Sequence, residues 1–218
     1  PGEDLGRYPR TEARDLAAAR AAGVDIAYCP EAAAMYGPDF QTRIEVTELA
    51  KPLCGASRPG HFAGVTTVVT KLFHVTLPQV AVFGQKDYQQ LAIIRRLVAD
   101  LDFGIDIICA PIVREADGLA MSSRNAYLDP EERAQAVSLS RGLGLAKDAF
   151  AGGQRDGAAL CAIAAREIAK APLAELEYLE IRDAESLAPV SLITGPVVMA
   201  VAARFSGARL IDNVLLTP

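Results

Sequence analysis

Residues 79–91 read QVAVFGQKDYQQL, and this stretch carries the clearest signal of the fold. The apolar run 79–83 predicts a buried strand, Gly84 turns the chain, and apolar residues at helical spacing over 87–101 predict an amphipathic helix. A second apolar run, 105–110, predicts the next strand. Strands that are apolar throughout and alternate with helices are typical of a parallel α/β sheet covered on both faces.

The residues before this unit continue the mixture of helices and strands. Helices are expected at 11–22 and 65–75, strands at 24–29 and 41–46, and a loop at 58–62. The helices follow from Ala-rich or periodic apolar sequence, with Gly or Pro at their ends.

The pattern changes after Pro111. Helices are predicted at 130–150 and 157–170, followed by closely spaced strands at 176–181, 197–203 and 209–215. Helices followed by bunched strands indicate a second, α+β domain. We therefore expect one domain over residues 1–112 and another over residues 113–218.

Composition and charge narrow the classes of protein. The chain has 218 residues, with 22 Lys and Arg against 27 Asp and Glu, which gives a net charge of −5. That sign provides no global attraction to nucleic acid or to an anionic membrane. Four cysteines without a CxxC pair indicate reduced thiols in a cytoplasmic protein rather than disulfides or a zinc site. No apolar run is long enough to span a bilayer.

The turn after the first strand of this unit is the first candidate site. Gly84 permits close backbone approach, Lys86 adds a mobile cation, and a helix N-terminus there favours phosphate. Asp87 can cap the helix or bind Mg²⁺ held by phosphates. Gln90 can hydrogen-bond an uncharged polar part of a substrate. The alternative is a plain strand–turn–helix in which Asp87 serves as the N-cap.

The loop DGLAMSSRN, residues 117–125, is the second candidate. Ser122 and Ser123 can donate to phosphate oxygens, and Arg124 supplies a planar fork of donors. The alternative is a polar loop between domains whose Ser and Asn residues make local turns.

The loop at 58–62 is the third candidate. Arg58 can pair with an anion and His61 can orient a carboxylate or an amine, whereas the alternative is a loop fixed by its Pro and Gly. His74 is expected to be a packed helix residue. No set of side chains for nucleophilic catalysis is present, which fits direct displacement without a covalent enzyme intermediate.

Five stretches, in the same order and spacing, resemble the pantothenate synthetase (pantoate–β-alanine ligase) family. They are Asp4-Leu5 with Tyr8-Pro9-Arg10-Thr11, Arg58-Pro59-Gly60-His61-Phe62 with Gly64-Val65, Phe83-Gly84-Gln85-Lys86-Asp87 with Gln89-Gln90-Leu91, Asp117-Gly118-Leu119-Ala120-Met121-Ser122-Ser123-Arg124-Asn125, and Arg209-Leu210-Ile211-Asp212-Asn213.

The resemblance implies a Rossmann-like nucleotidyltransferase domain with a smaller α+β C-terminal lid domain. It implies that pantoate attacks the α-phosphate of ATP to give pantoyl adenylate and pyrophosphate. The amine of β-alanine then gives pantothenate and AMP, with Mg²⁺ required. A homodimer in the cytoplasm is expected.

The resemblance also assigns residues. Lys86, Ser122, Ser123 and Arg124 match catalytic positions, and Asp87 is the metal candidate. The positions that match ATP contacts are Gly84, Gln85, Lys86, Asp87, Val113, Met121, Ser122, Ser123 and Arg124. Gln90 matches a pantoate contact.

One family motif has no counterpart. Members carry near their start a glycine-bearing motif with two histidines that contacts ATP, then another pantoate-binding Gln, but the only histidines here are His61 and His74. By the family pattern we therefore expect the N-terminal part of the Rossmann-like domain to be absent from this sequence, about two βα units, on the order of 60 residues or more at roughly 30 per unit. Such a piece should expose apolar sheet surface.

Two other functions stay open. One is a related nucleotidyltransferase that stops at an adenylylated product. The other, should the protein be no longer than this chain, is an inactive remnant that acts as a binding or dimerisation module.

Overall fold

The computed structural model describes residues 6, 8 and 10–218, in two compact units, residues 1–42 and 43–218. Asp4, Leu5 and Pro9, which belong to the first resembling stretch, lie outside the described residues. The domain boundary expected near residue 112 stays a prediction. It falls within the second unit, between its parallel and its antiparallel sheet.

The first unit contains the predicted N-terminal helix. Helix α1 spans Glu12–Ala21 and α2 spans Ala32–Met35. Thr11 stands at the N-cap position, but its hydroxyl donates to the Asp15 carboxylate at 3.1 Å and makes no cap bond to the helix backbone.

The prediction of a strand at 24–29 is wrong. These residues have no regular structure, and Ile26 is 84% exposed. Strand-forming side chains produce a strand only where a neighbouring backbone pairs with them. Neither sheet among the described residues includes this segment.

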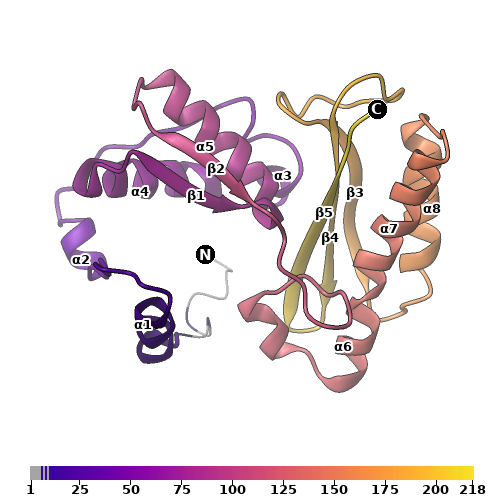
Figure 1. The fold of residues 1–218 in the computed structure, drawn as a ribbon, viewed down its shortest axis with the longest axis horizontal. Coiled ribbons are helices and arrows are strands. Elements are labelled where there is room, and N and C mark those ends of the chain that lie inside the picture. The colour runs from indigo at the N-terminus through magenta and orange to yellow at the C-terminus, as the bar shows by residue number, and fades with distance from the viewer. Residues whose placement is uncertain (1–5, 7, 9) are drawn as a thin grey trace. The chain divides into compact units, whose positions relative to one another are not determined.

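The second unit begins with the predicted helices and the parallel pair of strands (Figure 1). Its elements are α3 (Cys54–Ser57), α4 (His61–Thr76), β1 (Val80–Gly84), the 3-10 helix η1 (Gln85–Asp87), α5 (Tyr88–Asp100) and β2 (Asp106–Ala110). Strands β1 and β2 are parallel, and Val80 pairs with Asp106 at one end of the ladder and Gly84 with Ala110 at the other. The strand–turn–helix–strand order predicted from residues 79–110 is confirmed.

The prediction that β1 and β2 are buried on both faces is wrong. Ala81, Phe83 and Ile107 pack with α4 and α5, whereas Val80 and Val82 of β1 and Ile108 of β2 are about half exposed, with exposed fractions of 47%, 62% and 50%. Successive strand residues point to opposite faces, so an apolar run does not reveal which face is covered. The expected exposure of apolar sheet surface is confirmed here.

The prediction of a strand at 41–46 is also wrong. The Ile44 N–H donates to the Thr67 hydroxyl at 3.1 Å, and the Ile44 carbonyl accepts from the Thr66 hydroxyl at 2.5 Å. Hydroxyls of α4 thus bond the backbone groups that a partner strand would need. The loop expected at 58–62 is shorter, because Gly60, with φ of 81°, leads into α4 at His61.

The C-terminal part of this unit has the predicted helices and three antiparallel strands. Its elements are the 3-10 helix η2 (Ser123–Tyr127), α6 (Pro130–Ala136), α7 (Ser138–Ala151), α8 (Gly157–Ile168), β3 (Glu175–Asp183), β4 (Val197–Phe205) and β5 (Ala208–Leu216), in the sheet order β3-β4-β5. The helix expected at 130–150 is two helices separated at Val137. The α/β fold class with a second, smaller α+β part is confirmed.

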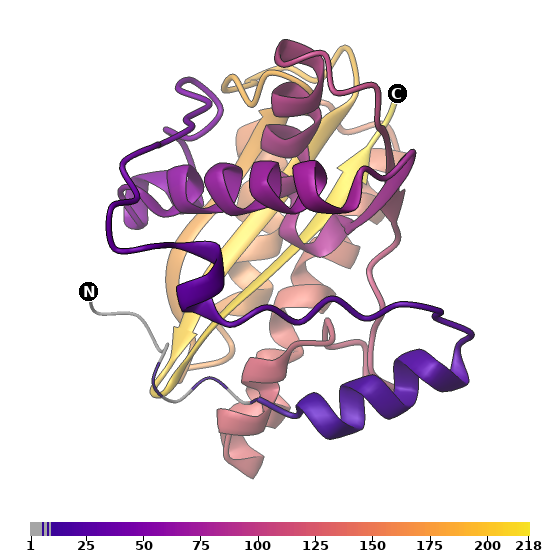
Figure 2. The ribbon, with the colours of Figure 1, turned by 90° about the vertical axis from the view of Figure 1, so that its left-hand side faces the viewer.

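Strand β4 is apolar apart from the exposed Arg204, because both of its faces are covered (Figure 2). Met199 and Val201 pack in one cluster with residues of α7 and α8. Val198 and Ala200 point to the other face and share a cluster with Tyr88 and other residues of α3, α4 and α5. The antiparallel sheet therefore lies between the two groups of helices and fixes the position of β5, its edge strand.

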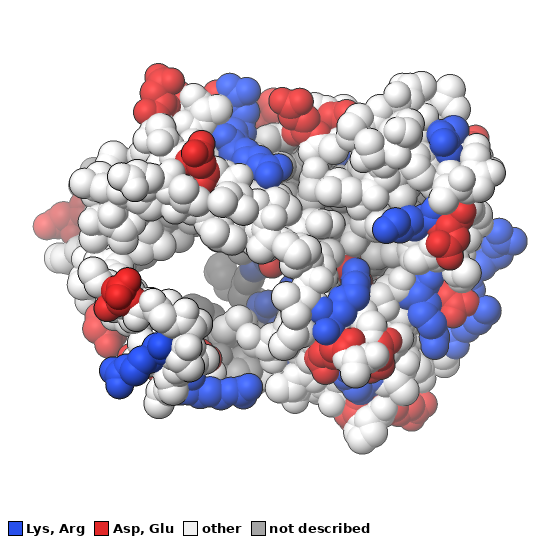
Figure 3. Space-filling view, viewed as in Figure 1, with Lys and Arg blue, Asp and Glu red and all other residues white. Residues whose placement is uncertain are grey.

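Charged side chains of both signs are interspersed over the face drawn in Figure 3. Every helix among the described residues is too short or too polar to cross a bilayer.

Candidate active site

The turn between β1 and α5 starts at Gly84. Its φ of −74° and ψ of 136° suit any residue, and a Cβ added there would meet no atom within 4 Å. The fold itself therefore does not require glycine at this position. The missing side chain leaves the backbone open at the C-terminal end of a parallel strand, where α/β proteins bind ligands.

Lys86 and Asp87 form the charged part of this turn. The Lys86 Nζ lies 3.8 Å from the Asp87 Oδ2, and the exposed fractions of the two side chains are 20% and 51%. Asp87 stands at the N-cap position of α5, yet its carboxylate makes no cap bond. The N-cap position expected for Asp87 in the alternative interpretation is therefore confirmed, but its side chain does not cap the helix backbone.

The two glutamines that follow have different environments. Gln89 is buried, and its Nε2 donates to the carbonyls of Leu49 and Pro52 at 2.8 Å each. Gln90 is only half-buried, and its side chain has no hydrogen-bond partner among the described residues. Gln89 therefore serves the fold, whereas Gln90 has polar groups left for a ligand, as its predicted role requires.

The second predicted segment begins within a short hairpin. The Met121 N–H donates to the Val113 carbonyl at 2.9 Å, and both side chains are exposed. The Ser122 Oγ then accepts from the Arg124 N–H at 3.2 Å and opens η2. Ser123 is exposed and Arg124 is half-buried.

Hydrogen bonds and ion pairs of charged and polar side chains stabilise this segment. The Asn125 Nδ2 donates to Glu115 at 2.6 Å, and Arg133 of α6 contacts Glu115 at 3.0 Å and Asp117 at 2.5 Å. The Asn125 bond, followed by the Arg133 bond, lowers the pKa of Glu115, and Arg133 lowers the pKa of Asp117. Both carboxylates stay charged near neutral pH, so the ion pairs persist.

Strand β5 bonds to the first predicted segment and to the hairpin in which the second one begins. The Asn213 Nδ2 donates to the carbonyls of Gln85 and Lys86 at 3.0 and 2.9 Å, and its Oδ1 accepts from Gln85 at 3.2 Å. Asp212 accepts two bonds from Arg114, which pairs with Ala120 in the hairpin, at 2.6 and 2.9 Å. One signal in the sequence could have revealed this link, because two adjacent polar residues stand inside an apolar strand.

The third predicted segment is joined by its own side chains. The Arg58 Nη1 lies 3.0 Å from the His61 Nε2 and 3.7 Å from the Cys54 Sγ. The roles expected for Arg58 and His61 toward a substrate stay predictions. His74 is exposed on α4, with its ring 5.3 Å from that of Phe103.

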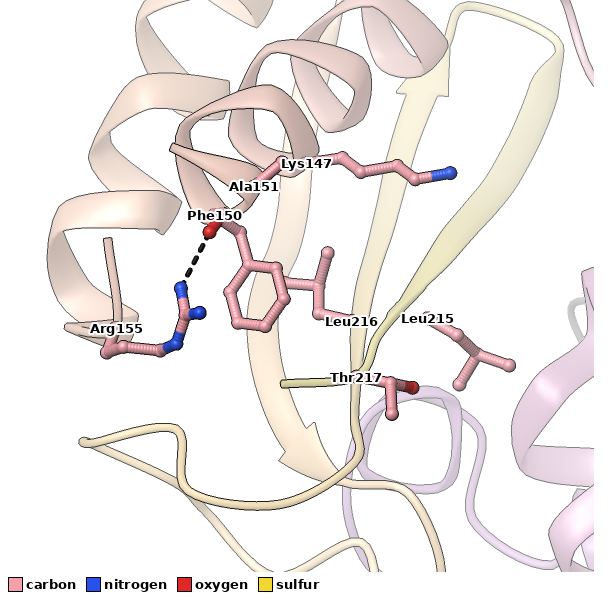
Figure 4. A pocket seen from close by; sticks show the side chains of 7 residues that line it. All are labelled: Lys147, Phe150, Ala151, Arg155, Leu215, Leu216 and Thr217. Atoms are coloured by element: carbon pink, nitrogen blue, oxygen red, sulfur yellow. Dashed lines mark hydrogen bonds between the residues drawn. The ribbon is translucent and has the colours of Figure 1, made fainter. Parts of the chain in front are cut away.

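A pocket of about 470 Å³ lies elsewhere, between the end of α7 and the end of β5 (Figure 4). Arg155 donates to the Phe150 carbonyl at 2.6 Å, and its guanidinium lies 4.2 Å from the centre of the Phe150 ring. The lining includes none of the predicted site residues.

The donor set bears on whether a metal fits the site. Among the described residues, no group of three or more His, Cys, Asp or Glu side chains could hold an ion. Mg²⁺ is commonly bound by one or two carboxylates together with substrate phosphates. The half-exposed carboxylate of Asp87 fits that arrangement, and a metal site built from protein ligands alone does not.

A parallel strand that ends in a Gly-Gln-Lys turn, with a Ser-Ser-Arg loop tied to the same neighbouring strand, is typical of a nucleotide-using α/β enzyme. The family model described as Pantoate-beta-alanine ligase matches residues 1–215. Two relatives, both called Pantothenate synthetase, come from Pelobacter propionicus and Solidesulfovibrio magneticus. They are 53% and 55% identical, over 98% of this chain and 75% of each relative. The chain belongs to the pantoate–β-alanine ligase family, which confirms the expected family and enzyme class.

Solved structures agree. The pantothenate synthetase of Thermus thermophilus superposes with a TM-score of 0.96 at 44% identity, covering 100% of this chain and 79% of that one. The pantoate-β-alanine ligase of Francisella tularensis, complexed with Beta-gamma ATP and Beta-alanine, has a TM-score of 0.75 at 30% identity. That match covers 97% of this chain and 72% of the other.

Proposed function

We propose that the protein condenses pantoate with β-alanine using ATP, releasing AMP and pyrophosphate through a pantoyl adenylate. The carboxylate of pantoate attacks the α-phosphorus of ATP, and pyrophosphate leaves. The amine of β-alanine then attacks the activated acyl carbon, and AMP leaves. One observation carries the proposal: in a chain of this family, η1 of the phosphate turn and η2, which includes Ser123 and Arg124, both contact β5.

Each residue of the proposed ATP site has its own role in the reaction. Lys86 and Arg124 stabilise the charge that grows on the leaving pyrophosphate, and Ser122 and Ser123 donate to phosphate oxygens. The open backbone at Gly84 admits the phosphates closely. Gln85, Val113 and Met121 complete the proposed ATP contacts.

Gln90 is proposed to bind pantoate. It lies one residue beyond Gln89, on the first turn of α5, so it follows the phosphate turn directly. Its amide donates and accepts hydrogen bonds, which suits the hydroxyl or carboxylate oxygens of that substrate.

Mg²⁺ is proposed as the cofactor, with Asp87 as the protein ligand. When bound, the ion neutralises part of the phosphate charge. Asp87 lies beside Lys86, so the ion and the ammonium group would act on the same phosphate chain.

The first experiment measures which substrates AMP release needs. The purified protein should release AMP only when ATP, pantoate and β-alanine are all present. Release of pyrophosphate that does not depend on β-alanine in the steady state would instead indicate an adenylylating transferase. Absence of ATP–Mg²⁺ binding by calorimetry to the folded protein would support the binding-module alternative, which family membership does not favour.

The second experiment removes the two cations. Lys86→Ala and Arg124→Ala should each lower kcat/KM by about 10²–10³-fold, because each removes stabilisation of transition-state charge. Lys147→Ala on α7 is the matched control, since Lys147 is exposed and lines the pocket that includes none of the predicted site residues. Rates like the wild type in both site variants, with unchanged melting temperatures, would refute these roles.

Three further expectations belong to this proposal. We expect a homodimer, which light scattering would detect as twice the chain mass of 23.1 kDa. We expect residues 113–218 to act as a lid over an ATP-binding domain of residues 1–112. We also expect the protein to work in the cytoplasm.

A further inference from the structure

We propose that Asp212 and Asn213 are positioning residues, which hold the turn that carries Lys86 and the loop that carries Arg124 at a fixed spacing. The inference rests on the proposed function, because it concerns the geometry of the same site. Neither residue is expected to touch substrate.

Strand geometry places the two side chains on opposite faces. Asp212 pairs with Val201 and Asn213 with Ala200, without a bulge between them. Side chains of directly opposed residues lie on the same face, and successive residues alternate. Val201 belongs to the cluster of α7 and α8 and Ala200 to that of α5, so Asp212 faces the first side and Asn213 the second.

Asn213 fixes the turn through its whole amide. Both N–H groups of its Nδ2 donate, one to the Gln85 carbonyl and one to the Lys86 carbonyl, and its Oδ1 accepts from the Gln85 side chain. Only 3% of the residue is exposed. Aspartate has the same shape but no donors, so it could not bond the two carbonyls.

Asp212 fixes the loop. It is 3% exposed and accepts the two bonds of the Arg114 fork together with the N–H of Asn213 at 2.7 Å. Arg114 also donates to the Gly118 carbonyl at 3.0 Å, which closes the hairpin that ends at Met121. The hairpin leads without interruption into Ser122.

The two links share one strand whose position is set by the core. Strand β5 contacts both η1 and η2, and β4 beside it is buried on both faces. A shift of reacting groups by about 1 Å can cost on the order of 10²-fold in rate. The pair Asp212–Asn213 therefore sets the distance across which Lys86 and Arg124 act on one phosphate chain.

The test compares two carboxylates that make similar ion pairs in one sheet. Asp212→Asn is compared with Glu177→Gln, because Glu177 of β3 accepts two bonds from Arg209, at 2.9 and 2.8 Å, and neither residue bonds to the 84–90 turn or the 117–125 loop. Asp212→Asn and Asn213→Ala should lower kcat by about 10–100-fold, with a smaller change in KM. Glu177→Gln should keep the kcat of the wild type at a comparable loss of melting temperature.

A conservative variant guards against failure to fold. Arg114→Lys keeps the charge beside Asp212 but loses the fork, so it should fold and show an intermediate kcat. A wild-type kcat in Arg114→Lys and Asn213→Ala, or an equal loss in Glu177→Gln, would overturn the positioning role. An inactive wild type with all three substrates would instead refute the proposed function.

Discussion

Replacing Gly84 with alanine separates a requirement of the ligand from a requirement of the fold. The backbone there has φ of −74° and ψ of 136°, which alanine adopts without strain, and the new methyl group would touch no protein atom within 4 Å. Gly-to-Ala changes at compatible positions stabilise by about 0.4–1 kcal/mol, because they reduce the entropy of the unfolded chain. The melting temperature of Gly84→Ala should therefore stay level or rise.

ATP binding should respond in the opposite direction. If phosphate oxygens approach this backbone closely, the methyl group must displace them. A displacement of reacting groups by about 1 Å can lower the reaction rate on the order of 10²-fold. We expect KM for ATP to rise by about 10–100-fold, with KM for β-alanine changed little. Steady-state AMP release at varied ATP, with calorimetric titration of ATP–Mg²⁺, measures both effects.

Two glycines of α7 serve as controls. A Cβ at Gly144 meets nothing within 4 Å, so Gly144→Ala should stabilise the helix by about 0.5–1 kcal/mol and leave KM for ATP unchanged. A Cβ at Gly142 would lie 2.9 Å from the Ala164 carbonyl oxygen, so Gly142→Ala should destabilise the protein. Wild-type ATP affinity in a folded Gly84→Ala protein would refute the close approach of phosphate to this turn.

Two other perturbations follow from buried and half-buried polar groups. Gln90→Ala should raise KM for pantoate by about 10-fold or more at unchanged stability, whereas Gln89→Ala should cost about 2 kcal/mol, since it abandons two carbonyls of the 49–52 segment. Steady-state kinetics and denaturant unfolding measure the two effects. A larger rise of KM in Gln89→Ala and a larger loss of stability in Gln90→Ala would reverse the roles assigned to the two glutamines. The bond from Arg209 lowers the pKa of Glu177 from 4.5 to about 2, so the folded protein resists protonation there and the unfolded chain does not. The resulting stability is present above pH 4.5 and is lost as the pH falls towards 2. Glu177→Gln should be less stable than the wild type by about 1–3 kcal/mol at about pH 6, and a deficit that stayed constant down to about pH 2 would contradict this.

Local rules predicted the helices well. Helical spacing and the residues at helix ends located α4, α5 and α8, because a helix satisfies its own backbone within a few residues. The strands of the C-terminal sheet were located too, since each has neighbours close in the sequence.

Strands that depend on distant partners were harder to predict. Residues 24–29 and 41–46 have strand-like composition but form no strand, and backbone groups of Ile44 bond to threonine hydroxyls instead. The apolar runs of β1 and β4 look alike in sequence. Yet β1 is covered on one face and β4 on both, because burial depends on which elements pack against each face.

The linear order of residues contained the chemistry of the site: a Gly-Gln-Lys-Asp turn after a strand, a Met-Ser-Ser-Arg loop, and the family to which they belong. Each is a local motif whose side chains can be recognised one by one. The link between them appeared only in three dimensions, where Asp212 and Asn213 reach segments that lie far away in the chain. Alternation along β5 sends these neighbours to opposite faces, and packing of the core sets what each of them meets.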